Sequence, residues 1–184
     1  MELWDVYNKD RSKTGKKIER GRRLSEGEFH LVVYVCVFNS YNQMLIQQRQ
    51  PFKDGFPNMW DFTAGGSAVS GDSSNSAASR ELFEEIGLKI DFEGIVPHFT
   101  INCKDAIADF YLVNKDTEID TLKLQYEEVQ AVKWASQKEI LDMIDSREFI
   151  PHHKSLVDLC FDMRESYGTR QKCAENYFEK GNLE

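Results

Sequence analysis

Several features that mark other classes of protein are missing from this chain of 184 residues. Its four cysteines, Cys36, Cys103, Cys160 and Cys173, include no C-x-x-C pair, and their scatter through apolar segments is typical of buried free thiols in a reducing compartment. The longest apolar run, residues 31–38, is far too short to span a bilayer, and residues 1–17 lack the apolar stretch of a secretory signal. These absences predict a cytoplasmic protein without a membrane segment.

A surplus of positive charge is also missing. The chain has 31 acidic residues against 23 lysines and arginines, which gives a formal net charge of −8. Such a chain is a poor partner for a nucleic-acid backbone, but it can bind a small anion where basic groups or metal ions gather. Hydrophobic residues make up 41% of the chain and charged residues 29%, which is ordinary for a globular protein with a sizeable core.

The chain shows no internal repeat and no long linker, so we expect a single domain over residues 1–184. Within it we expect an N-terminal β-hairpin arm at about 1–28 and a C-terminal helical extension at about 148–184. Hydrophobic periodicity predicts strands at 2–8, 30–39, 43–49, 59–66, 90–101, 106–113 and 127–134, and helices at 74–86, 136–145 and 152–166. This order predicts a mixed α/β (α+β) fold, with one helix inside the run of strands and further helices after it.

The predicted helix 74–86 carries three carboxylates near its C-terminal end. Glu81, Glu84 and Glu85 are spaced i, i+3, i+4 and therefore share one face. The apolar side chains that fall on the opposite face are Leu82, Phe83 and Ile86. Like charges repel at this spacing, the helix dipole disfavours negative charge here, and Arg80 is the one cation nearby. The pattern is either a solvated acidic face or a site where bound cations relieve the repulsion.

The residues around this helix form an ordered motif. From Gly66 to Leu88 the spacing reads G-x5-D-x7-R-E-L-x-E-E-x-G-L. It resembles the Nudix box, G-x5-E-x7-R-E-U-x-E-E-x-G-U with U a bulky aliphatic residue, at every fixed position except Asp72, where the family has Glu. The resemblance covers about residues 3–145 and implies a Nudix-like α/β/α sandwich with a mixed β-sheet, a box helix and C-terminal helices. It also implies an enzyme that cleaves a diphosphate joined to another group.

The resemblance implies a role for each charged residue of the motif. Glu84 and Glu85 correspond to the main metal ligands, and Glu81 to a ligand that can also activate water as a base. Arg80 corresponds to the residue that orients Glu81. Because no Cys or His accompanies these carboxylates, they suit Mg²⁺ or Mn²⁺ far better than zinc.

Three further parts of the site are less sharply defined by the resemblance. The backbone carbonyl of Gly65 or Gly66 is expected to complete the metal coordination. Asp72 corresponds to an outer carboxylate, and because it is one methylene shorter we expect it to lose a direct salt bridge or to act through water. Many relatives use an acid outside the motif, and the sequence leaves four candidates open: Asp105, Asp109, Glu127 and Glu128.

The wider sequence resembles one branch of the family, which contains isopentenyl-diphosphate isomerase and related bacterial hydrolases. The segments that carry this resemblance are "LWDVYNKDRSKTGKK", "LIQQRQPFKDGFPNMWD" and the box. In the isomerase a basic pair at this spacing holds the substrate diphosphate, and Arg49 and Lys53 match it. Guanidinium and ammonium groups suit phosphate oxygens, and the alternative is that the two residues are surface charges.

Isomerase chemistry is nevertheless disfavoured. The position of its catalytic cysteine aligns with Gly65, that of a metal-binding histidine with Ser67, and that of its second acid with Ile107. A catalytically silent binding module is the other alternative, and the intact arginine and glutamates of the motif argue against it. The leading hypothesis is a metal-dependent diphosphohydrolase that acts on a small-molecule diphosphate, such as a nucleoside diphosphate derivative. A homodimer is compatible with the resemblance.

Overall fold

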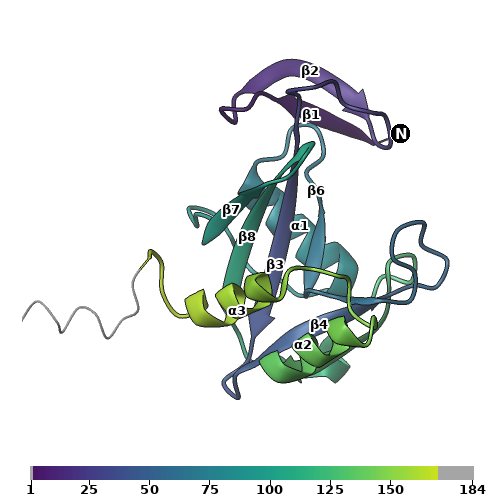
Figure 1. The fold of residues 1–184 in the computed structure, drawn as a ribbon, viewed down its shortest axis with the longest axis vertical. Helices are drawn as coiled ribbons and strands as arrows, with labels where there is room; N and C mark the ends of the chain where they lie inside the picture. Colours follow the sequence, from purple (N-terminus) through teal and green to yellow (C-terminus); the bar gives the residue numbers. More distant parts are fainter. Residues whose placement is uncertain (1, 170–184) are drawn as a thin grey trace, which may run out of the picture.

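A mixed β-sheet runs through the centre of the protein (Figure 1). The computed structural model describes residues 2–169, and in this range seven strands join the sheet. They are β3 (His30–Phe38), β4 (Gln43–Arg49), β5 (Trp60–Asp61), β6 (Ala64–Ser67), β7 (Phe99–Asn102), β8 (Ala106–Asn114) and β9 (Val129–Ser136). Strand β3 pairs parallel with β8 and antiparallel with β4 and β6, while β7 continues the sheet beyond β8, and β5 and β9 pair with β4.

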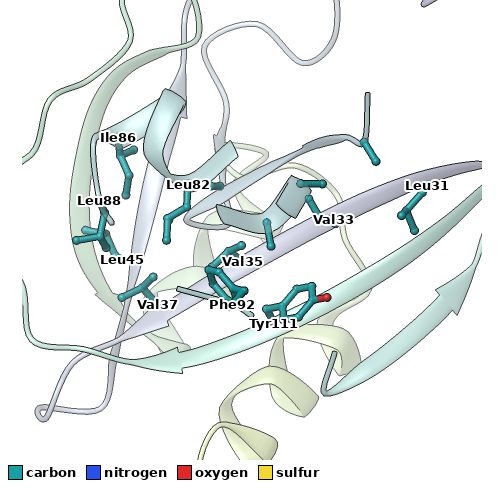
Figure 2. Packing of buried hydrophobic residues seen from close by; sticks show 14 of the residues in the cluster. Leu31, Val33, Val35, Val37, Leu45, Leu82, Ile86, Leu88, Phe92 and Tyr111 are labelled. Carbon is teal, nitrogen blue, oxygen red and sulfur yellow. The ribbon is translucent and has the colours of Figure 1, made fainter. Parts of the chain in front are cut away.

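Helices cover both faces of this sheet. Alternate residues of β3 point to opposite faces, and because they are apolar on both, each face must be covered. Val33, Val35 and Val37 pack with α1 (Ser74–Ile86) in one buried cluster (Figure 2). Cys36 and Phe38 pack in a second cluster with α2 (Gln137–Asp145) and α3 (Lys154–Met163). The predicted α/β/α sandwich with a mixed sheet is therefore confirmed.

A separate hairpin lies against one end of the sheet (Figure 1). It consists of β1 (Leu3–Tyr7) and β2 (Lys13–Glu19), which pair antiparallel. Asp5 connects the hairpin to the loop before α1, because its carboxylate accepts hydrogen bonds from Ser70 Oγ at 2.8 Å and from the Gly71 backbone N–H at 3.0 Å. The hairpin is thus tied to the segment that leads into the acidic helix.

Helix α1 begins and ends where the sequence predicts. The Ser73 side chain accepts the backbone N–H of Ser76, and the Ser76 hydroxyl accepts the backbone N–H of Ser73, which forms a capping box. At the other end, Gly87 adopts a left-handed φ of 73° and its N–H bonds the Phe83 carbonyl. The capping box predicted for α2 is also present, with Ser136 and Glu139 as its two members.

Four expectations about the helices, the strands and their buried faces need correction. Segment 59–66 is two short strands, β5 and β6, because the Thr63 hydroxyl accepts the Val37 N–H and donates to the Leu45 carbonyl in place of strand pairing. Residues 90–98 form a loop, and the strand begins only at Phe99, after Pro97, which has no N–H to donate.

The two remaining corrections concern the helices. Helix α3 spans Lys154–Met163 rather than 152–166, because the backbone of His153 is extended, with a ψ of 130°, and the chain turns after Met163. Phe83 does not join Leu82 and Ile86 in the core but is 48% exposed, because it is rotated by about 100° from Leu82, and the ammonium of Lys89 lies 5.0 Å from its ring centroid.

A short 3₁₀ turn, η1 (Ile119–Thr121), completes the elements of the described range. Cys36, Cys103 and Cys160 are free thiols, as expected, but Cys103 is exposed rather than buried. Cys173 and the end of the predicted C-terminal extension lie outside the described residues. Between residues 2 and 169, no helix combines the length and the apolar character needed to cross a membrane.

Candidate active site

The carboxylates of α1 line a hollow of about 480 Å³ on the surface. The two glycines within β6 form another part of its lining, and the loops after β4 and before β9 close its sides. All three glutamates of the acidic face line it, together with Arg80, Gly65 and Gly66. The fold therefore brings every charged residue expected from the motif, except Asp72, to the wall of one hollow.

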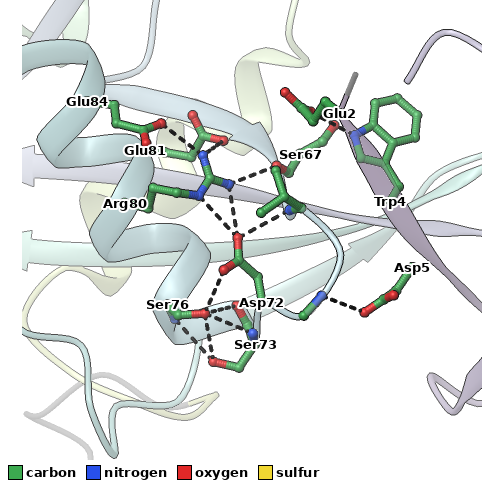
Figure 3. Close-up of polar contacts among 12 residues, drawn as sticks. Glu2, Trp4, Asp5, Ser67, Asp72, Ser73, Ser76, Arg80, Glu81 and Glu84 are labelled. Carbon is green, nitrogen blue, oxygen red and sulfur yellow. Dashed lines mark hydrogen bonds and ion pairs between the residues drawn. The ribbon is translucent and has the colours of Figure 1, made fainter. Parts of the chain in front are cut away.

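Arg80 is the hub of the polar contacts in this region (Figure 3). Its Nη1 lies 3.0 Å from Glu81 Oε1 and 3.0 Å from Glu84 Oε2, and its Nη2 donates to the Ser67 carbonyl at 3.1 Å. Partial burial by itself lowers the pKa of the guanidinium, but the surrounding carboxylates outweigh burial and raise it. Arg80 thus stays charged and fixes the orientation of the two glutamates.

Asp72 keeps the direct salt bridge that its shorter side chain was expected to lose. Its Oδ2 accepts from Arg80 Nε at 3.2 Å and from Nη2 at 3.1 Å. The same carboxylate accepts the Val69 N–H and the Ser76 hydroxyl, each at 3.2 Å (Figure 3). The loop before α1 folds back so closely that the missing methylene is not needed. Asp72 therefore holds Arg80 from behind the hollow.

Glu81 is packed against the backbone of β6. A Cβ built on Gly66 would lie 2.4 Å from the Glu81 carboxyl carbon, so the close approach of the carboxylate requires glycine at this position. Burial raises the pKa of the Glu81 carboxyl above its ordinary value, and the attraction of Arg80 only partly offsets this. Glu81 is thus a carboxylate with raised proton affinity, held in place by Arg80 and by the shape of β6.

Glu85 is the most deeply buried acid of the helix, with 4% of the residue exposed. Its Oε2 accepts hydrogen bonds from Gln47 Nε2 at 2.9 Å and from the Gly65 backbone N–H at 3.2 Å. Burial, reinforced by the nearby charge of Glu81, raises the pKa of the Glu85 carboxyl well above its ordinary value, although the two hydrogen bonds work in the opposite direction. Gln47 was not expected from the sequence, because nothing in the strand pattern shows that its side chain faces this acid.

The chemistry of this hollow fits a hard divalent cation. Its candidate ligands are all oxygens, acidic side chains outnumber basic ones in its described lining, and Gly66 lets the Glu81 carboxylate lie directly against the β6 backbone. As the side chains lie, however, no three Cys, His, Asp or Glu residues between positions 2 and 169 enclose a common point as a ligand set. Glu84 is turned onto Arg80, and Glu85 onto Gln47 and Gly65, so a cation would compete with these contacts.

The predicted phosphate-binding pair also lines this hollow. Arg49 donates from Nε to the Gly55 carbonyl at 2.9 Å, and Lys53 forms an ion pair of 2.7 Å with Glu128. Of the four candidate outer acids, Glu127 and Glu128 line the hollow and Asp105 is exposed outside it. Asp109 is fully buried elsewhere, in a salt bridge with Arg11.

Sequence reasoning missed the contribution of the N-terminal hairpin. Glu2 and Arg20, at the open ends of its two strands, line the hollow and form a salt bridge of 3.1 Å with each other. Arg20 belongs to a basic stretch, "KKIERGRR", in which no residue is distinguished by pattern. Only the docking of the hairpin through Asp5 shows which of these cations reaches the site.

A second hollow of about 420 Å³ adjoins the first, and both share Arg20 and Arg49 in their linings. Tyr34 lines it, and a Cβ built on Gly65 would lie 2.8 Å from the Tyr34 ring. A cysteine at this position, as in the isomerase, would therefore collide with Tyr34 unless the ring moved. Ile107 is buried in the core, so neither position offers an acid or a base to this hollow.

Comparisons with known proteins agree with this arrangement. The family model of the NUDIX domain matches residues 28–157. A Nudix hydrolase of Listeria monocytogenes is 43% identical over 152 residues, which cover 83% of this chain and 90% of that protein. An isopentenyl-diphosphate Delta-isomerase of Pectobacterium atrosepticum is 36% identical over only 84 residues, 46% of this chain and 45% of the isomerase.

Solved structures show the same fold. The crystal structure of a Deinococcus radiodurans protein aligns with a TM-score of 0.71 at 23% identity, over 86% of this chain and 99% of that one. Members of the Nudix hydrolase family generally act on nucleoside diphosphate derivatives and generally use divalent metal cations. The matched family model and the Listeria relative show that this chain belongs to the Nudix hydrolase family.

Proposed function

We propose that this protein is a Mg²⁺- or Mn²⁺-dependent diphosphohydrolase that cleaves a nucleoside diphosphate derivative or a related organic diphosphate. The observation that carries the proposal is the imbalance of charge in one hollow, whose described lining has seven acidic side chains against four basic ones, with Arg80 as the cation paired to Glu81 and Glu84 of α1. Such an excess of negative charge is costly without a cationic ligand. The substrate would be a small molecule rather than a nucleic-acid backbone.

The metal would be held by Glu81, Glu84 and Glu85, with the carbonyl of Gly65 or Gly66 as a further oxygen ligand. When bound, a divalent cation of this kind neutralises diphosphate charge and favours ionisation of a bound water. The raised pKa values of Glu81 and Glu85 support this assignment, because burial makes both carboxylates accept positive charge, whether a proton or a cation.

Within this scheme Glu81 is the general base. Arg80 Nη1 engages Oε1 of Glu81, which leaves Oε2 to accept a proton from the attacking water. Arg80 orients Glu81 and is itself oriented by Asp72. Arg49 and Lys53 would bind the phosphate oxygens, with Lys53 exchanging Glu128 for the substrate. Glu128 would then be the acid outside the box.

The test is hydrolysis of a panel of diphosphates, with phosphate or pyrophosphate release as the measurement. The panel contains nucleoside diphosphates, nucleotide sugars, dinucleoside polyphosphates and isopentenyl diphosphate. We expect release with Mg²⁺ or Mn²⁺ and none in excess EDTA. Full activity in EDTA would refute the metal-dependent scheme.

A second assay separates hydrolysis from isomerisation. Isopentenyl diphosphate incubated with the protein in deuterated buffer should gain no carbon-bound deuterium, because Gly65 offers no side chain for proton transfer between carbons. Deuterium in dimethylallyl diphosphate at an enzymatic rate would contradict the hydrolase assignment.

A further inference from the structure

Two large aromatic side chains stand exposed to solvent at the rim of the active-site hollow. Phe52 is 56% exposed and Tyr126 is 72% exposed, yet their ring centroids are only 5.8 Å apart, with planes at 43°. They come from two different segments, the loop after β4 and the loop before β9. Exposed apolar side chains beside a binding hollow indicate a surface that meets a ligand.

Phe52 is distinguished within the hollow by its chemistry. Among the described residues that line it, Phe52 is the single apolar side chain, and the others are charged, polar or glycine. Tyr126 is not part of the lining, although its neighbours Gln125 and Glu127 are. Phe52 therefore faces the hollow, and Tyr126 packs against it from the side.

The same two loops are tied together a second time. Lys53 follows Phe52 directly and forms the 2.7 Å ion pair with Glu128, two residues after Tyr126. The aromatic contact and the ion pair join neighbouring residues of the same two loops, and together they restrain the position of Phe52. A restrained ring loses less conformational freedom when it binds a partner.

We propose that Phe52 is the platform on which a planar ring of the substrate stacks, with Tyr126 as its brace. The inference rests on the proposed function, in that the diphosphate of the same molecule is bound beside the carboxylates of α1. It narrows the substrate to diphosphates whose organic group carries a flat aromatic ring, such as a nucleobase. Phe52 is then a specificity-determining residue of the reaction.

An open platform of this kind suits a flat ring better than a hydrocarbon chain. A ring can cover one face of Phe52 and keep its polar edges in water, which is how bases stack on exposed aromatic side chains. A branched isoprenoid chain gains from burial on all sides, and a rim that is more than half exposed leaves most of such a chain wet.

The second hollow is lined by Tyr34, His152 and Phe56, and the first two of these rings are already stacked on buried rings of the core, whereas Phe56 is 49% exposed and serves as a control in the binding experiment. Tyr34 stacks on Phe110 with centroids 4.8 Å apart, and His152 stacks on Phe62 at 4.6 Å. His152 also bonds Asp61 through Nε2 at 2.9 Å. Phe52, by contrast, has Tyr126 as its ring partner and keeps more than half of its surface free.

The experiment is isothermal titration calorimetry in Mg²⁺ with two non-hydrolysable probes. One is adenosine 5′-(α,β-methylene)diphosphate, and the other is methylenediphosphonate, which lacks the nucleoside. In the wild type the nucleoside probe should bind about 10-fold tighter or more, the scale of one base stacked on an aromatic side chain. Phe52→Ala should remove about 10-fold of this preference, Phe52→Tyr should keep it, and Tyr126→Ala should reduce it less than Phe52→Ala does.

Two controls make the result specific. Tyr41, which is 83% exposed and lines neither hollow of the described part, should leave the preference unchanged when replaced by Ala. Phe56 lines the second hollow, so a loss in Phe56→Ala with none in Phe52→Ala would place the ring there and overturn the proposal. A wild type with equal affinity for both probes would overturn it as well.

Hydrolysis is measured separately, so that the two proposals fail separately. A wild type that shows the Phe52-dependent preference but cleaves no diphosphate would refute the proposed function and uphold the stacking. A wild type that cleaves nucleoside diphosphates, with the same loss of kcat/KM in Phe52→Ala for substrates with and without a ring, would refute the stacking and uphold the hydrolase.

Discussion

Two polar clusters that α1 contributes to differ in their balance of charge. At the N-terminal end, Asp109 is fully buried and receives two hydrogen bonds from Arg11, at 2.9 and 2.7 Å, and one each from the hydroxyls of Thr100 and Ser74, both at 2.6 Å. In the second cluster, Arg80 at the middle of the helix pairs with three carboxylates, those of Asp72, Glu81 and Glu84, and Glu85 lines the same hollow.

The difference separates a structural cluster from a binding site. The Asp109 cluster sets one carboxylate against one guanidinium and satisfies its acceptors within the protein, so no ligand is required there. The Arg80 cluster keeps a surplus of negative charge beside an open hollow, which is a cost to folding that a ligand can repay. Balanced charge is expected to serve stability, and unbalanced charge to serve function.

The strongest way to break this comparison is Glu85→Gln, which removes surplus charge while keeping the shape of the side chain. We expect kcat to fall by about 100-fold or more, the scale of losing one preorganised electrostatic group. In metal-free buffer the variant should unfold at an equal or higher temperature than the parent, because repulsion with Glu81 is relieved. Kinetics with Mg²⁺ and thermal unfolding in EDTA measure the two effects.

A suitable control is Glu93→Gln, an exposed glutamate that does not line the active-site hollow. Its activity and stability should match those of the parent. A Glu85 variant that turns over substrate like the parent would show that the site is misassigned.

Asp109→Ala tests the balanced cluster. In contrast to Glu85→Gln, it should lower the stability of the fold and leave the activity unchanged. The change leaves Thr100, Ser74 and Arg11 without their common acceptor, so we expect a loss of about 2–3 kcal/mol in the free energy of unfolding. The kcat/KM of the folded fraction should stay close to that of the parent, because Asp109 lies outside the hollow. Urea denaturation measures the stability, and activity is normalised to the folded protein.

Asp105→Ala is the matched control, since this neighbouring aspartate is exposed and should change stability by no more than about 0.5 kcal/mol. If Asp109→Ala abolished activity without loss of stability, Asp109 would be the acid outside the box after all.

The double variant Arg49→Ala with Lys53→Ala tests whether the cations of the unbalanced cluster's hollow bind substrate. If these groups bind the substrate diphosphate, KM should rise by about 10-fold or more, since even one hydrogen bond between charged groups is worth roughly that factor. The effect falls on KM because both cations would hold phosphate oxygens in the ground state and the transition state alike. Unchanged kinetics would mean that both residues are surface charges.

Much of this site could be predicted from the sequence because its signal is local. The spacing of Glu81, Glu84 and Glu85 within one helix places them on one face, and Gly87 ends that helix at the predicted residue. The assignment of β4 succeeded for the same reason, since its apolar residues and flanking turns are contiguous.

What the sequence left open, missed or mispredicted depends on contacts that no local pattern encodes. The reach of Asp72 to Arg80 depends on how the loop folds back, and the choice of Glu127 and Glu128 over Asp109 as lining residues depends on which loops meet. Gln47 and Arg20 look like ordinary polar residues until the sheet and the docked hairpin place them at the hollow. No local pattern encodes such placements.

The smallest expected effect compares the pH dependence of stability at the two kinds of cluster. Asp5 is a balanced carboxylate, and although burial by itself raises its pKa, the bonds from Lys13, Gly71 and Ser70 lower it from 3.8 to about 2. Its contribution to stability is therefore present above pH 3.8 and is lost as the pH falls towards 2. The pH dependence that Glu85 contributes has the opposite sign. Because its pKa is raised in the folded state, the metal-free protein should lose stability as the pH rises above 4.5.

Urea denaturation in EDTA at several pH values between 2 and 7 should separate the two signs. Asp5→Asn should cost about 1 kcal/mol near pH 7, and the difference from the parent should shrink towards pH 2, because the pH there reaches the pKa of about 2 that Asp5 has in the folded protein. Glu85→Gln should show no deficit at pH 4 and a growing advantage over the parent as the pH rises. If both variants followed the same pH trend, the contrast between balanced and unbalanced charge would not hold in this protein.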